Sequence, residues 1–157
     1  MKSEGLTLFA VAILIAGCAA MDREAPRPIR GHLVLETIPN PLVAKSLGGD
    51  AYEVAFDLVM REEGGVATRI EDFTVEALAL GGVIVRSERH PAAYITARGY
   101  PAEVAAGQFL RFSFVKRWTL PTRLLLSGAA VRITARTIDA SGARDVTTFR
   151  ADVKRSE

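Results

Sequence analysis

The fold is decided by residues 52–60, which read Tyr52-Glu53-Val54-Ala55-Phe56-Asp57-Leu58-Val59-Met60. The even-numbered positions carry aromatic or aliphatic side chains, whereas the odd-numbered positions carry two acidic residues, an alanine and a valine. Successive side chains of a β-strand point to opposite faces, so this alternation predicts a strand with one face in a core and the other largely in water. The next five residues, Arg61-Glu62-Glu63-Gly64-Gly65, predict a turn.

The same period of two continues on both sides of this stretch, interrupted by turns that contain Gly or Pro. Strands are expected over residues 31–36, 66–80, 83–85, 94–97, 108–116, 124–127 and 129–139, and in a last strand whose residues Thr147, Phe149, Ala151 and Val153 face inward. Turns or loops are expected at Pro39-Asn40-Pro41, at residues 86–91, around Trp118 up to Pro121, and at residues 139–143. About seven to nine short strands favour an all-β Greek-key sandwich over a closed barrel.

Three stretches with turns suggest the kind of sandwich. They are the strand from Val54 to the turn at Gly64-Gly65, the stretch Val104-Ala105-Ala106-Gly107-Gln108 ahead of an aromatic strand, and a terminal hairpin around Asp139-Ala140-Ser141-Gly142. This pattern resembles the immunoglobulin-like domains of bacterial surface proteins, including the fibronectin type III and cell-adhesion-related families. The resemblance spans residues 33–153 and implies an immunoglobulin-like β-sandwich. A competing likeness, to the late-embryogenesis-abundant type 2 sandwich of some bacterial lipoproteins, implies the same architecture.

The N-terminal stretch is of a different kind. Residues 6–16 form an uncharged run of 11 residues behind a segment that carries Lys2. A membrane-spanning helix needs roughly 20 apolar residues, so this shorter run predicts the apolar region of a secretory signal. The run ends in Ile15-Ala16-Gly17-Cys18, which resembles the lipobox of bacterial lipoproteins.

The lipobox resemblance implies a diacylglycerol thioether on Cys18 and cleavage before it, with Ile15, Ala16 and Gly17 as the signal-peptidase recognition residues. Residues 1–17 are then the signal peptide, residues 18–28 the lipidated Cys and an extended tether, and residues 29–157 the β-sandwich domain. By the same resemblance Ala19, in place of a retaining Asp, favours the periplasmic face of the outer membrane if the envelope is Gram-negative. The alternative is that Cys18 is an ordinary small residue beside the cleavage site of an unlipidated signal.

Composition limits the partners and the number of domains. The chain of 157 residues has a formal net charge of +2, which gives no reason to propose nucleic acid as a partner. After removal of the signal, about 140 residues suit one ordinary domain. Cys18 is the only cysteine, so a domain lipidated there must fold without disulfides.

The sequence shows no catalytic or metal-binding constellation. Its two histidines, His32 and His90, have no second ligand at metal-site spacing, and His90 is expected in a loop before Pro91. The acidic pair Glu62-Glu63 is expected at a solvated turn, and Glu71-Asp72 lacks the pattern of a calcium-binding loop. The chain is therefore expected to be non-enzymatic and to need no cofactor or metal.

The strongest candidate for a binding surface is the basic, aromatic stretch 109–123. Trp and Arg supply most of the energy at interface hot spots, so this stretch would suit anionic lipid, polysaccharide or a protein partner. Alternatively, Trp118 packs over one open end of the sandwich while the charges keep an edge strand soluble. The candidate partner-binding residues are Arg111, Lys116, Arg117, Trp118 and Arg123.

These observations predict a non-enzymatic, membrane-anchored envelope lipoprotein whose β-sandwich acts as a protein-binding or structural module. Its partners would be the membrane, through the lipid on Cys18, and an envelope protein. The alternative is an accessory lipoprotein that binds a small or lipidic ligand in a sandwich similar to the late-embryogenesis-abundant type 2 domain. A large internal apolar cavity would favour this alternative, whereas a filled core with an exposed aromatic patch would favour the binding module.

Overall fold

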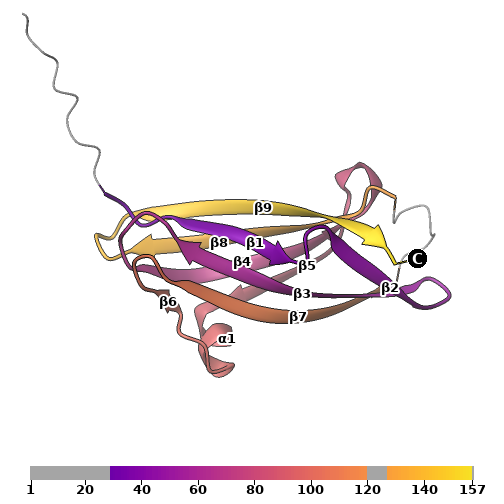
Figure 1. Ribbon diagram of the computed structural model, residues 1–157, viewed down its shortest axis with the longest axis horizontal. Helices are drawn as coiled ribbons and strands as arrows, with labels where there is room; N and C mark the ends of the chain where they lie inside the picture. Colours follow the sequence, from indigo (N-terminus) through magenta and orange to yellow (C-terminus); the bar gives the residue numbers. More distant parts are fainter. Residues whose placement is uncertain (1–28, 120–126, 157) are drawn as a thin grey trace, which may run out of the picture.

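The computed structural model describes residues 29–119 and 127–156, and most of these residues lie in β-strands (Figure 1). The signal peptide, Cys18 and the tether predicted from the sequence lie outside the described residues, as do Arg123 and residues 124–126 of the strand expected over residues 124–127. In chain order the elements are β1 (Leu33–Ile38), β2 (Leu42–Gly48), β3 (Ala51–Glu62), β4 (Thr68–Leu78), the short 3-10 helix η1 (Leu80–Gly82), β5 (Ile84–Pro91), α1 (Ala92–Ala97), β6 (Glu103–Val104), β7 (Phe109–Thr119), β8 (Ala130–Asp139) and β9 (Arg144–Arg155).

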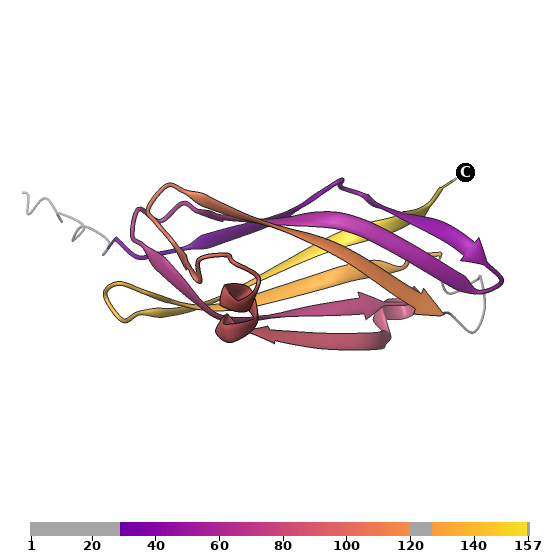
Figure 2. The same ribbon diagram turned by 90° about the horizontal axis from the view of Figure 1, so that it is seen from below.

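The strands form two sheets that face each other. In the first sheet, β3 pairs with β7 on one side and with β1 and then β2 on the other. In the second sheet the order is β5, β4, β8 and β9, and the short β6 pairs with the start of β4. The sheets join where β2 runs parallel to the end of β9 (Figures 1 and 2).

This order of strands confirms the predicted immunoglobulin-like sandwich. The strands β1, β3 and β7 stand in the places of strands A, B and E of that fold, and β5, β4, β8 and β9 in the places of C′, C, F and G. In the described part of the chain, no strand stands in the place of D, on the open side of β7.

The alternation in residues 52–60 has the predicted result. Tyr52, Val54, Phe56, Leu58 and Met60 all lie in the core between the sheets. They face inward-pointing residues of β4, β8 and β9, and the aromatic residues of β7 complete this core: the ring centroids of Phe56 and Phe114 are 5.4 Å apart, and those of Phe73 and Phe112 are 5.8 Å apart. Apolar burial on this scale is the main stabilising term of such a fold.

The two prolines after β1 end that strand, as predicted, but only for residues 39–41. Both peptide bonds, Ile38-Pro39 and Asn40-Pro41, are cis, and the chain resumes at once as β2, a strand that the sequence reading missed. The register explains this result, because β1 pairs with the second half of β3 and β2 with its first half along the same edge. The proline segment is therefore an interruption within one edge of the sheet.

Two predictions about the middle of the chain are wrong. Residues 86–91, expected as a loop, belong to the strand β5, and residues 94–97, expected as a strand, lie in the helix α1. The charged residues of β5 are tolerated because this strand is at the edge of its sheet, where charges are common. The helix α1 contributes one buried residue, Ile95, to the core.

Candidate functional site

The candidate binding residues of β7 point to opposite faces of the strand. Arg111 and Arg117 lie on the exposed outer face of the first sheet, where they pair with Asp57 and Glu53 of β3. Lys116 and Trp118 lie on the inner side, and Trp118 belongs to β7 rather than to the loop predicted for it. Because the side chains of a strand alternate, the stretch cannot form the single basic, aromatic surface that the sequence suggested.

The inner pair borders a groove where the open side of β7 faces β5. One hollow of about 400 Å³ is lined by Arg86, Glu88, Val115, Lys116 and Arg117. A smaller hollow beside it is lined by Arg86, Glu88 and Lys116 together with Trp118, Val75 and Ala77. We call this region the β5–β7 groove, and define it by Arg86, Glu88, Lys116 and Trp118. In Figure 2, α1 lies at one end of the space between the two strands.

An ion pair crosses the groove and links the two sheets. Lys116 of β7 donates a hydrogen bond to Glu88 of β5, and Arg86 Nε lies 2.7 Å from the other carboxylate oxygen of Glu88. The Lys116 side chain is only 14% exposed, so its charge is largely removed from water. The hydrogen bond from Lys116 holds the pKa of Glu88 below its ordinary value. Glu88 therefore stays ionised between two cations.

His90, which the sequence suggested would lie in a loop, belongs to β5 and is buried next to Glu88 of the groove. Its ring is buried, 4.9 Å from Phe73 and 4.4 Å from Tyr94 between ring centroids. Burial, and next the nearby charge of Lys116, lower the pKa of His90, so the ring is neutral at pH 7. Its Nε2 atom lies 3.8 Å from Glu88 and makes no hydrogen bond among the described residues.

Trp118 is the aromatic residue that lines the groove. It is half-buried, packs against the core and is the register partner of Tyr52. The side chain therefore serves packing, one of the two roles expected for it, and leaves part of its surface in the groove. A partly buried Trp is typical of the centre of a protein interface, whereas Lys and Glu are less frequent there.

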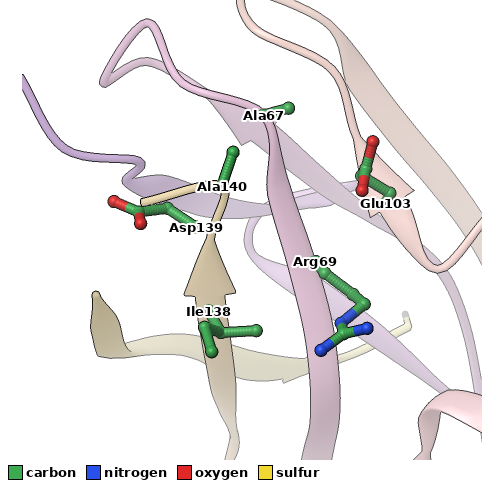
Figure 3. A pocket seen from close by; sticks show the side chains of 6 residues that line it. All are labelled: Ala67, Arg69, Glu103, Ile138, Asp139 and Ala140. Carbon is green, nitrogen blue, oxygen red and sulfur yellow. The ribbon is translucent and has the colours of Figure 1, made fainter. Parts of the chain in front are cut away.

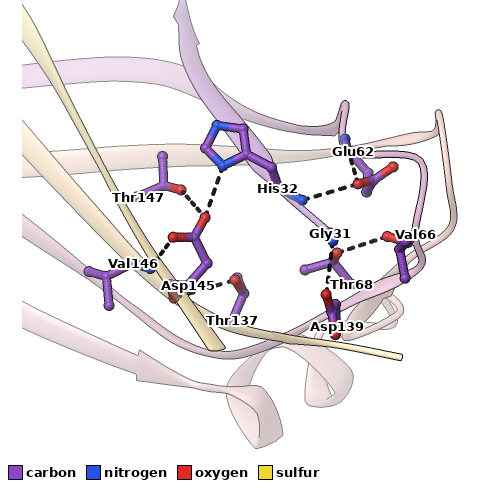
Figure 4. A network of polar contacts seen from close by, with 11 residues as sticks. Gly31, His32, Glu62, Val66, Thr68, Thr137, Asp139, Asp145, Val146 and Thr147 are labelled. Carbon is purple, nitrogen blue, oxygen red and sulfur yellow. Dashed lines mark hydrogen bonds and ion pairs between the residues drawn. The ribbon is translucent and has the colours of Figure 1, made fainter. Parts of the chain in front are cut away.

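A second polar region lies at the other end of the molecule, where the chain enters the sandwich (Figure 4). Glu62, expected in a solvated turn, is only 1% exposed and accepts hydrogen bonds from the backbone N–H groups of His32, Gly64, Gly65 and Gly107 at 2.8–3.2 Å. Burial acts to raise the pKa of Glu62, but these four donors hold it below its ordinary value. Glu62 thus ties three segments together.

Asp139 has a similar role in the hairpin between β8 and β9. Its carboxylate accepts hydrogen bonds from the Ser141 hydroxyl at 2.6 Å and from the N–H groups of Gly31, Ser141 and Ala143 at 2.9 Å. The hydroxyl of Ser141 and the N–H of Gly31 contribute most to lowering the pKa of Asp139 to about 2. Beside it, Arg69 and Glu103 border a shallow hollow of about 200 Å³ (Figure 3). Because its carboxylate is already engaged, we assign Asp139 a structural role.

His32 and His90 lie in different parts of the molecule and do not form one site. His32 Nδ1 lies 2.9 Å from Asp145 at the entry end, and His90 is buried beside β5. In residues 29–119 and 127–156, no three His, Cys, Asp or Glu side chains come together as they would around a metal ion. In the same residues, no helix has the length and apolar character needed to cross a membrane.

Comparisons with known proteins support the fold alone. No protein-family model matches the chain, and no curated protein matches it. A Bordetella pertussis protein assigned to ApaA is 11% identical over 82% of this chain and 100% of its own, with a TM-score of 0.54. The structural genomics target SoR45 is 10% identical over 79% of this chain and 87% of its own, with a TM-score of 0.53. The CARDB domain of PF1109 from Pyrococcus furiosus is also similar, at 14% identity over 79% of this chain and 95% of its own, but its TM-score is only 0.36.

The fold and the groove therefore define a class, the immunoglobulin-like β-sandwiches, and at this identity the comparisons add no function to it.

Proposed function

We propose that this chain is a membrane-anchored envelope lipoprotein whose β-sandwich is a non-enzymatic, protein-binding module. The observation that carries the proposal is the β5–β7 groove. It combines a half-buried Trp118, a Lys116–Glu88 ion pair that is partly removed from water, and open hollows on either side. Trp is one of the residues that contribute most binding energy at the centres of protein interfaces, and the exposed Arg86 at the groove rim is a second such residue type.

The alternative, a small or lipidic ligand within the sandwich, has less support. The inward side chains of both sheets form one buried cluster from Leu33 to Val153. The two hollows of the groove have charged side chains in their walls, so they suit polar partners better than an acyl chain. We therefore favour a protein partner at the groove.

The anchor can be tested separately from the groove. The variant Cys18→Ser lacks the thiol that would carry the diacylglycerol, so we expect it to move from the membrane fraction to the soluble fraction of the envelope. The measurement is fractionation of cells that express the wild-type chain or the variant at equal levels. Continued attachment of Cys18→Ser to the membrane would refute the lipoprotein assignment and would leave the binding module untouched.

Partner binding at the groove is tested by photo-crosslinking in intact cells. A photoreactive amino acid replaces Arg86 at the groove rim or, as a control, Arg150 on β9. The side chains are similarly exposed, 56% and 53%, so nonspecific capture should be similar. We expect a discrete cross-linked protein from position 86 and none from position 150. Equal patterns from both positions would refute binding at the groove.

A further inference from the structure

The outer face of the first sheet has rows of side chains that run across the strands and stop at β7. Lys45, Glu53 and Arg117 are register partners on β2, β3 and β7, so this row alternates positive, negative, positive. In the next row, Ala55 is the partner of Val115, whose side chain is 61% exposed. The row that includes Arg111 begins at Glu36 of β1. Each of these rows ends on an exposed residue at the open edge of the sheet.

The backbone of β7 is also open along this edge. The N–H of Glu62 donates to the carbonyl of Gln108 at 2.9 Å, in the same register that aligns β3 with β7. In an antiparallel pair the hydrogen-bonded positions recur at every second residue, so the even-numbered residues of β7 bond to β3. The odd-numbered residues, among them Arg111, Val115 and Arg117, direct their N–H and C=O groups away from β3. No strand of the described part of the chain pairs with them.

The charges on β7 indicate what kind of strand would fit there. Arg117 Nε donates to Glu53 at 2.8 Å, and Arg111 Nε donates to Asp57 at 2.9 Å. A guanidinium group has five N–H donors, so each arginine can bind a second carboxylate on its other side. An acidic residue opposite Arg117 would extend the alternating row, and an apolar residue opposite Val115 would cover its exposed side chain.

A second copy of β7 would fit this edge poorly. The strand carries three cations, Arg111, Lys116 and Arg117, and no acidic residue. Pairing two such strands would bring six positive charges together without any carboxylate from the added strand, and like charges across strands are destabilising. The partner strand must therefore supply the negative charge.

We propose that the open edge of β7 binds an extended acidic segment of a partner protein as an added antiparallel strand, with acidic residues opposite Arg111 and Arg117 and an apolar residue opposite Val115. The added strand takes the place of strand D beside β7. This inference rests on the proposed function, since it names the chemistry of the partner for the module. The side chains on the inner side of the added strand would lie over the β5–β7 groove.

The probe is a synthetic peptide with two glutamates six positions apart, as Arg111 and Arg117 are, a valine two positions after the first glutamate, and threonine elsewhere. Binding to the purified full chain in a mild nonionic detergent is measured by fluorescence anisotropy of the labelled peptide. We expect a peptide with lysines in place of the glutamates to bind at least about tenfold more weakly. Equal binding of the two peptides would refute the predicted charge pattern.

Backbone pairing is tested with N-methyl groups on alternate amides of the glutamate peptide. Only every second N–H of an added strand faces β7. Methylation of the amides that face β7 should abolish binding, whereas methylation of the amides that face away should leave binding within about twofold of the unmethylated peptide. This result distinguishes strand addition from simple attraction between charges. Equal effects of the two methylation patterns, or no binding of the unmethylated peptide, would refute the added strand.

A pair of protein variants tests the edge from the other side. Val115→Pro removes one outward N–H and should weaken peptide binding at least about tenfold, whereas Val115→Thr keeps this N–H and should bind within about threefold of wild type. Thermal unfolding of both variants shows whether they fold. If Val115→Pro does not fold, the two methylated peptides on the wild-type chain decide the question. Equal binding by two folded variants would refute the proposal.

The outcomes separate this inference from the proposed function. If the peptide does not bind but position 86 captures a protein in cells, the edge-strand proposal is wrong and the binding module stands. If the peptide does not bind and position 86 captures nothing, both are wrong.

Discussion

At the scale of the residue, Glu62 shows how a polar side chain can hold a β-sandwich together. The sequence places it beside Glu63 and two glycines, a context that suggests a solvated turn. In the fold it is buried and accepts four backbone N–H groups from three separate segments. A buried acceptor that serves several donors is costly to remove, because each donor then loses its partner without regaining water.

We therefore expect Glu62→Gln to lower the free energy of unfolding by about 2–3 kcal/mol, since a neutral amide accepts these bonds less well and adds a donor that has no acceptor. The matched control is Glu63→Gln. The neighbouring Glu63 side chain is about half exposed, so this substitution should change the free energy of unfolding by less than about 0.5 kcal/mol. Urea denaturation of the two variants measures the difference. Equal stabilities would show that the buried carboxylate is dispensable.

Asp139 predicts a dependence of stability on pH. Its pKa is lowered from 3.8 to about 2 in the folded chain, so folding favours the ionised form. The resulting stabilisation is complete above the ordinary value and is lost as the pH falls from there towards about 2. We expect the difference in stability between wild type and Asp139→Asn to shrink across this range. A difference that stays constant down to about pH 2 would contradict the assignment.

At the scale of the element, the edge strand β5 explains much of the groove. Its run of charged residues has no apolar alternation, yet it pairs with β4 from Ile84 to Pro91. Because it is an edge strand, most of its side chains are exposed, and only Glu88 and His90 are drawn inward. Because the side chains of Glu88 and His90 point inward, Glu88 lies beside Lys116 of the other sheet.

A double-mutant cycle with Lys116→Met and Glu88→Gln measures this link. We expect a coupling energy of about 1 kcal/mol, larger than for an exposed pair, because both side chains are largely shielded from water. The control cycle uses Arg150→Met and Asp152→Asn, an exposed pair on β9 with a separation of 3.7 Å, and should give less than about 0.3 kcal/mol. Equal couplings in the two cycles would contradict a structural link across the groove.

At the scale of the whole molecule, the sheets are joined on one side and open on the other. The joined side is the parallel pairing of β2 with β9, where Leu42, Val43 and Ala44 face Val153, Lys154 and Arg155. On the opposite side, β5 and β7 are both edge strands in the described part of the chain. They are bridged there by the Lys116–Glu88 ion pair and by the rings of His90 and Phe114, whose centroids are 5.9 Å apart. This asymmetry gives the sandwich one closed side and one open side.

Truncation tests the joined side. Removal of residues 153–157 deletes the buried Val153 and its pairing with β2, so we expect a loss of about 3 kcal/mol in the free energy of unfolding. Removal of residues 156–157 alone deletes one hydrogen bond, from Ser156 to Ala44, and should cost about 1 kcal/mol. Denaturant unfolding compares the two. A similar loss from both truncations would show that the parallel pairing adds little.

The sequence by itself determined which faces of the regular strands are buried. The alternation in β3, β7 and β8 predicted the inward residues correctly, because the period of two is a local property of an extended chain. The hairpin at residues 139–143 was also predicted correctly, since a short loop with Gly142 in the left-handed region carries its own signal. Cys18 and the lipobox remain a prediction, since they lie outside the described residues.

Only the tertiary structure decided which strands lie at edges, and with them the candidate site. The strand β2, the charged part of β5 from Arg86 to Pro91 and the helix α1 were missed because prolines, charges and short length hide the local signal, and pairing with β3 and β4 or packing on the core overrides it. Likewise, nothing local shows that Glu88 meets Lys116 or that Trp118 continues the strand that carries Arg111. Such contacts depend on how the sheets stack, which is a property of the whole chain.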